Sequence, residues 1–114
     1  MATRLALRGV ELRYVITDHL FRRGPQSIPD IVDDLHHYGF EVTAPASKTV
    51  SDALRWEVRR GRLRRLRRGH YGPGVMPRGT EHRIYARAMA LRAQAVLLTA
   101  RDDEQWWNLV STDW

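Results

Sequence analysis

The residues in this 114-residue chain best suited to chemistry are arginines, and many of them stand close together. Eight arginines and one glutamate, Glu57, give residues 55–68 a net charge of +7, whereas the whole chain carries +6. The rest of the chain is therefore almost neutral. A guanidinium forms paired hydrogen bonds with phosphates and with the guanine edge. A dense basic patch on a nearly neutral body is typical of a surface that binds a polyanion.

No other arrangement of reactive side chains matches a known catalytic or metal-binding pattern. The five histidines include no pair four residues apart, and the chain has no cysteine. No serine, histidine and acid stand in the context of a hydrolase motif. We therefore expect no metal, no cofactor and no enzymatic activity.

Length and composition limit the domain organisation. The chain is 43% apolar and 28% charged, which suits one small globular domain. It has neither the apolar core of a signal peptide near its start nor the ~20 apolar residues of a membrane span. We expect a cytoplasmic protein with no membrane partner, built from a domain over residues 1–78 and a helical extension over 79–114.

The apolar spacing predicts four main helices. The first runs over residues 10–23. The second begins after an N-cap at Ser27 and ends at Gly39, and the third runs from residue 46 or 47 to residue 60. The stretch "GFEVTAP" between them is expected to be a turn. A long helix follows an N-cap at Thr80, and Asp102 to Glu104 are expected to cap a short last helix.

The third helix has two unlike faces. At 100° per residue, Val50, Ala53, Leu54 and Val58 fall on one side and predict its buried face. The opposite side carries three cations and one acid, namely Lys48, Arg55, Arg59 and Asp52. A basic face opposite the core indicates that this helix contacts the polyanion.

The opening arginine run continues into a predicted hairpin. Its arms are residues 63–67 and 70–72, its turn contains Gly69, and Tyr71 is expected to anchor it in the core. Leu63 and Leu66 are three residues apart, which a regular strand would place on opposite faces. Either a bulge lies between them or Leu63 packs before the strand begins.

This order of elements resembles a winged helix-turn-helix domain. The segments that carry the resemblance are "SIPDIVDDLHHYG", "SKTVSDALRWEVRRG" and "RLRRLRRGHYG". The long last helix is similar to that of PadR-type repressors, and the hairpin is similar to that of AbiEi-type antitoxins. The resemblance implies a mainly α fold with a small β-hairpin, the third helix in the major groove of DNA, and the hairpin on the backbone or in the minor groove.

The expected function is sequence-specific binding of double-stranded DNA by a transcriptional regulator. Two alternatives remain: a module that binds RNA or ribosomal particles, and an antitoxin-like module that docks an acidic protein. The candidate DNA-binding residues are Ser47, Lys48, Thr49, Arg55, Arg59, Arg62, Arg64, Arg65, Arg67 and Arg68.

The long last helix predicts a homodimer. Its apolar residues recur at alternating spacings of four and three, as in helices that pack on another helix. The alternative is that this stripe folds back on the first helix. The candidate interface residues are Ile84, Ala88, Leu91, Ala95, Leu98, Trp106 and Trp107.

Overall fold

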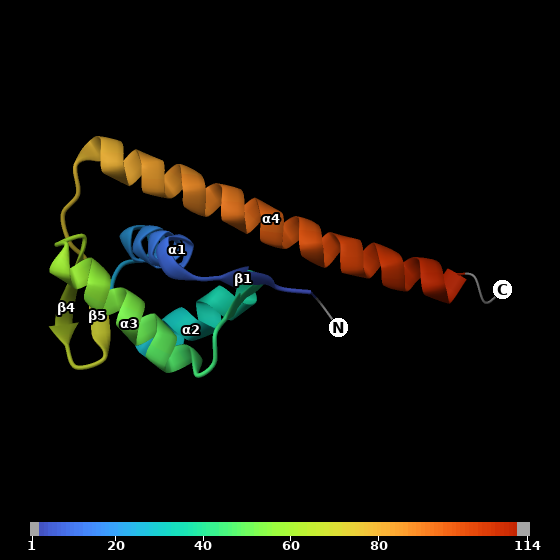
Figure 1. Cartoon of the computed structure of the whole chain (residues 1–114), viewed down its shortest axis with the longest axis horizontal. Coiled ribbons are helices and arrows are strands. Elements are labelled where there is room, and N and C mark those ends of the chain that lie inside the picture. Colours follow the sequence, from blue (N-terminus) through green and yellow to red (C-terminus); the bar gives the residue numbers. More distant parts are fainter. Residues whose placement is uncertain (1–2, 112–114) are drawn as a thin grey trace.

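The computed structural model describes residues 3–111 of the chain, with side chains up to residue 100. Three helices and two small sheets gather beside one half of a long C-terminal helix (Figure 1). The elements are β1 (Leu5–Leu7), α1 (Gly9–Arg23), β2 (Gln26–Ser27), α2 (Ile28–His37), β3 (Phe40–Val42), α3 (Ala46–Arg59), β4 (Leu63–Arg67), β5 (His70–Pro73) and α4 (Arg78–Ser111).

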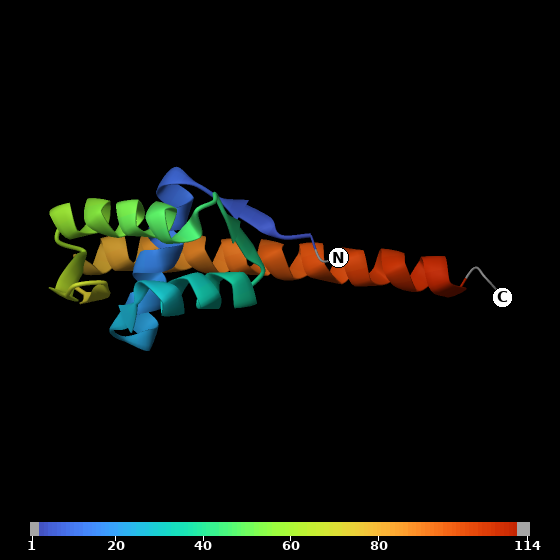
Figure 2. The ribbon, with the colours of Figure 1, turned by 90° about the horizontal axis from the view of Figure 1, so that it is seen from below.

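The helices form layers, with α1 between α4 on one side and the α2–α3 pair on the other (Figures 1 and 2). Leu12, Ile16 and Leu20 of α1 are buried in the shared core, together with Leu35 of α2 and Leu54 of α3. The exposed side of α3 therefore faces away from α4. Within the described residues, no helix has the length and apolar character needed to cross a bilayer.

The apolar stripe of α4 packs within its own chain. Ile84, Ala88, Leu91 and Ala95 are at most 3% exposed, and α4 lies along α1. The assignment of these four residues to a dimer interface is wrong, because the chain itself already covers the stripe: α1 lies along α4, and Gly39 lies against Ala95. Leu98 is half-buried, and the side chains of the two remaining candidates, Trp106 and Trp107, lie outside the described residues.

The last helix is also longer than its sequence signals predicted. It begins at Arg78, so Thr80 lies in its first turn, and it continues to Ser111 without a separate capped segment. The predicted N-cap and the predicted short last helix are both wrong. No glycine or proline lies between Thr80 and Ser111, and alanine and leucine favour an uninterrupted helix.

Two sheets brace the helices. One has strand order β2–β5–β4 and is antiparallel: β4 and β5 form the predicted hairpin, and β2, directly before α2, adds a third strand. The other pairs β1 with β3 in parallel, with Leu5 opposite Phe40 and Leu7 opposite Val42. The "GFEVTAP" segment is therefore not only a turn. Its strand forms because burial of Leu7 and Phe40 pairs two segments that are remote in sequence.

The start of α2 forms as its sequence predicts. The amide of Asp30 donates to the Ser27 side chain at 3.2 Å, which confirms the N-cap. Within the same helix, Asp34 accepts from Gln26 and contacts the buried His19 of α1, each at 2.9 Å. These contacts fix α2 against α1, and α3 packs on both.

Candidate nucleic-acid interface

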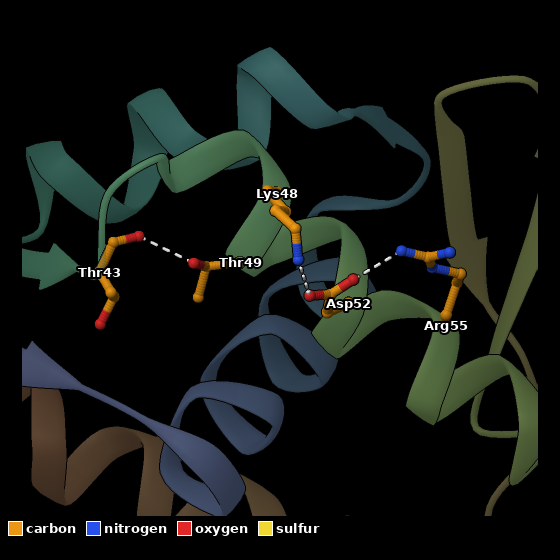
Figure 3. Close-up of polar contacts among 5 residues, drawn as sticks. All are labelled: Thr43, Lys48, Thr49, Asp52 and Arg55. Atoms are coloured by element: carbon orange, nitrogen blue, oxygen red, sulfur yellow. Dashed lines mark hydrogen bonds and ion pairs between the residues drawn. The ribbon is translucent and has the colours of Figure 1, made fainter.

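The outer face of α3 carries the charges that its sequence placed opposite the core. Val50 and Leu54 are fully buried, whereas Lys48, Asp52 and Arg55 are exposed. Lys48 donates to Asp52 at 3.2 Å, and Arg55 donates to the other carboxylate oxygen of Asp52 (Figure 3). These donors hold the pKa of Asp52 below its usual value, with the bond from Lys48 as the largest cause. Asp52 is therefore an anion at neutral pH.

The first turn of α3 offers fewer free donors than expected. The Thr49 hydroxyl donates to the carbonyl of Thr43 at 2.8 Å and so closes the loop before the helix (Figure 3). The amides of Lys48 and Thr49 donate to the carbonyl of Pro45. Thr49 and both amides therefore serve the fold, because the protons that a phosphate contact needs are already donated. Ser47 is exposed.

The hairpin presents its arginines outward. Leu63 is buried and Leu66 is 45% exposed, so the two leucines lie on opposite faces as regular strand alternation predicts. A register shift between Arg65 and Arg67 marks a bulge at Leu66. Of the two alternatives, a bulge is present and Leu63 lies within β4 rather than before it, but only Leu63 packs in the core. Tyr71 is 5% exposed, which confirms its place in the core. The exposed cations of the hairpin are Arg64, Arg65, Arg67 and Arg68.

One cleft joins the helix face to the hairpin. It has a volume of about 240 Å³ and lies where the last turns of α3 approach the two strands. Arg55 and Arg59 line it from α3, Arg65 lines it from β4, and Val58 and Tyr71 supply its apolar surface. The fold thus brings three of the predicted binding residues together although ten positions separate the first from the last.

Arg62 has a different environment from its neighbours. Its guanidinium binds both carboxylate oxygens of the fully buried Glu57, with the Nη2–Oε1 distance at 2.8 Å, and only 17% of its side chain is exposed. Glu57 raises the pKa of Arg62 further above its usual value. The assignment of Arg62 to DNA binding is wrong, because its charge is used to fix the junction between α3 and β4.

A second group of arginines surrounds Trp56 beside this junction. The guanidinium carbons of Arg13, Arg60 and Arg59 lie 4.7, 5.1 and 5.9 Å from the indole ring. Arg13 also lies 3.4 Å from Glu57, so this one buried acid pairs with a cation from α1 and with Arg62 from the turn before β4. Stacking on the ring orients these guanidiniums along the edge of the α3 face.

The distribution of counter-charges divides the basic residues into two groups. In the part of the chain described with side chains, Lys48, Arg55, Arg13 and Arg62 have carboxylate partners. Six other cations have no carboxylate within ion-pairing distance there: Arg59, Arg60, Arg64, Arg65, Arg67 and Arg68. These uncompensated charges lie together at the end of α3 and on the hairpin, where they form one positive patch.

Sequence reasoning missed the roles of Glu57 and Arg13. Glu57 follows Val50 by seven residues, about two helical turns, so it shares the buried face of α3. An acid in that position signals a buried ion pair, and an arginine within reach is the expected partner. No comparable signal identified Arg13, because its contact with Glu57 depends on how α1 crosses α3.

No family model, curated protein or solved structure matches this chain. Among the described residues, no group of three or more histidine or acidic side chains is placed to hold a metal ion. The described surface presents guanidinium donors on a helix and on an adjoining hairpin.

Proposed function

We propose that this chain is a sequence-specific DNA-binding protein of the winged helix-turn-helix type that regulates transcription. One observation carries the proposal: the exposed face of α3 and the arginines of the β4–β5 hairpin adjoin across one cleft. A helix has the width of the DNA major groove, and a flanking hairpin of cations suits the phosphates beside it.

The two elements have different tasks in this proposal. Arg55 and Arg59 reach the base edges, where a guanidinium pairs with O6 and N7 of guanine. Lys48 and Ser47 contact the backbone near the start of α3. Arg64, Arg65, Arg67 and Arg68 hold the phosphates or enter the minor groove. Phosphate contacts fix the position of the protein, whereas base contacts select the sequence.

A selection from random duplexes tests the proposal. We expect the protein to enrich a motif that contains guanine, and the Arg55→Ala/Arg59→Ala variant to lose that enrichment. Arg23→Ala/Arg83→Ala is the matched control, because both residues are exposed cations outside the α3–hairpin surface. No enrichment over the starting pool would contradict the proposal. Preferential capture of structured RNA in the same reaction would support the RNA-binding alternative instead.

We also propose that two copies associate through α4 near the point where this helix leaves the body of the protein (Figure 1). Val96 and Leu97 of α4 are 64% and 63% exposed, and Leu97 and Leu98 line a cavity of about 260 Å³ with Leu5 of β1. A dimer would present two α3 helices to half-sites on one duplex. Val96→Glu/Leu97→Glu should shift sedimentation from dimer to monomer, whereas Val75→Glu, 82% exposed on the connector, should not. A monomeric unmodified protein at high micromolar concentration would contradict this.

A further inference from the structure

One acid lies in the middle of the proposed DNA-reading face. Asp52 is half-exposed on the outer side of α3, between Lys48 one turn before it and Arg55 one turn after it (Figure 3). Both cations bind its carboxylate, at 3.2 and 2.5 Å. The remaining charges of the α3–hairpin surface are positive.

This carboxylate is unfavourable for simple attraction to a phosphate backbone. It repels phosphate, and it holds two of the cations that would otherwise face the DNA. A surface that bound any duplex through charge alone would bind more tightly without it. Its exposed pairs with Lys48 and Arg55 contribute little to stability, whereas its carboxylate offers a contact that a cation cannot make.

The donor and acceptor pattern of the major groove identifies that contact. An ionised carboxylate only accepts hydrogen bonds, and its two oxygens have room for several donors. Cytosine presents its N4 amine as a donor in the major groove, whereas guanine presents two acceptors that suit arginine. Asp52 and Arg55 thus form an acceptor and a donor that are adjacent on one helix face.

We propose that Asp52 is a specificity-determining residue whose carboxylate accepts a hydrogen bond from N4 of cytosine while Arg55 reads a neighbouring guanine. In the free protein, Asp52 holds the Arg55 side chain in place, so less freedom is lost when the guanidinium meets its base. Lys48 is released to the backbone when DNA binds. The inference rests on the proposed DNA-binding function.

Two substitutions at one position separate base reading from simple support of Arg55. Asparagine suits adenine, because its amide pairs with N6 and N7. Asp52→Asn should therefore change one position of the selected motif from cytosine to adenine. Asp52→Ala should reduce the preference for cytosine at that position by about tenfold or more. It should leave the preference for guanine at the neighbouring position unchanged.

The charge change itself needs a control. Asp33→Asn removes one negative charge from an exposed position on α2, away from the α3 face. This control should leave the motif unchanged, whereas Asp52→Ala should also bind random duplex more tightly than the unmodified protein.

The outcomes distinguish this inference from the function on which it rests. Absence of any enriched motif for the unmodified protein would overturn the DNA-binding proposal itself. An enriched motif that Asp52→Asn and Asp52→Ala leave unchanged would overturn the role of Asp52 alone. Loss of the guanine position without a change at cytosine would also overturn it, because Asp52 would then act only by holding Arg55.

Discussion

The outer face of α3 and the β4–β5 hairpin are both basic, but only one of them carries its own counter-charge. On α3, Asp52 binds Lys48 and Arg55. On the hairpin, Arg64, Arg65, Arg67 and Arg68 have no carboxylate partner among the described side chains. A face that carries both a hydrogen-bond acceptor and cations suits selection of a base sequence, whereas a face of uncompensated cations suits general attraction to phosphate. The difference suggests that specificity and affinity reside in separate elements.

The largest expected effect concerns the junction between these two regions. Glu57→Gln leaves Arg62 and Arg13 beside a buried site without their counter-charge, and breaking a buried ion pair costs about 3–5 kcal/mol. We expect the free energy of unfolding in urea to fall by that amount. Asp52→Asn is the control, because ion pairs between exposed side chains contribute little to stability. Equal losses in both variants would show that Glu57 does not anchor the hairpin.

The next prediction addresses the uncompensated charges. Replacing Arg64, Arg65, Arg67 and Arg68 by alanine removes up to four phosphate contacts from the hairpin. Each contact contributes about 0.9 to the slope of log K against log salt concentration, so the slope should become shallower by about 3–4. Titrations of labelled duplex at several salt concentrations measure it. The selected sequence motif should not change, and a changed motif would contradict this division of tasks.

The α3 face should show the opposite behaviour. Arg55→Ala and Arg59→Ala should each reduce discrimination between the selected motif and random duplex by about 1–3 kcal/mol. Their effect on the salt slope should be smaller than that of the hairpin variant. Paired titrations with both duplexes give both quantities. If the hairpin sets sequence preference and α3 does not, the two roles are reversed.

The sequence predicted α3 and the hairpin better than it predicted the contacts that these elements make with the rest of the chain. The faces of α3 and the arms of the hairpin followed from spacing, because 3.6-residue and two-residue periods are local properties. The N-cap at Ser27 marked the start of α2 correctly for the same reason, whereas α2 ends at His37, before the predicted Gly39. These signals placed Lys48, Arg55, Arg59 and the hairpin arginines on an exposed surface.

The contacts between remote segments were not predictable in this way. The β1–β3 pairing joins residues about 35 positions apart, and the burial of Ile84 and Leu91 depends on where α1 lies. Arg62 and Arg64 look alike in the sequence, and only the turn between α3 and β4 decides which of them reaches Glu57. Tertiary packing decides which of several like charges is used for stability.

The smallest expected effect concerns the contact between His19 of α1 and Asp34 of α2, the two helices on which α3 packs. Burial lowers the pKa of His19 below its ordinary value of 6.5, although Asp34 at 2.9 Å opposes the shift. At a pH above 6.5, His19 is neutral in both the folded and the unfolded protein. Its contribution to stability is therefore complete there, and it declines as the pH falls below about 6.5 because the unfolded protein then binds the proton more readily. Gln26 holds the pKa of Asp34 low, so this acid adds a loss only at still lower pH.

Thermal unfolding between pH 7.5 and 5.5 measures this effect. The unmodified protein should lose more thermal stability on acidification than His19→Gln, which has no proton to gain. Asp18 acts in the opposite direction, because burial raises its pKa and its protonation favours the folded state. The comparison between the two proteins removes that common contribution. Parallel pH profiles would contradict the role of His19.

The central claim is that the α3–hairpin surface binds double-stranded DNA through its cations. The most direct measurement is the affinity of the full chain for a random duplex as a function of salt concentration. With about five phosphates neutralised, the slope of log K against log salt concentration should be roughly −4 to −5. A slope near zero, or no binding at low salt, would contradict the claim.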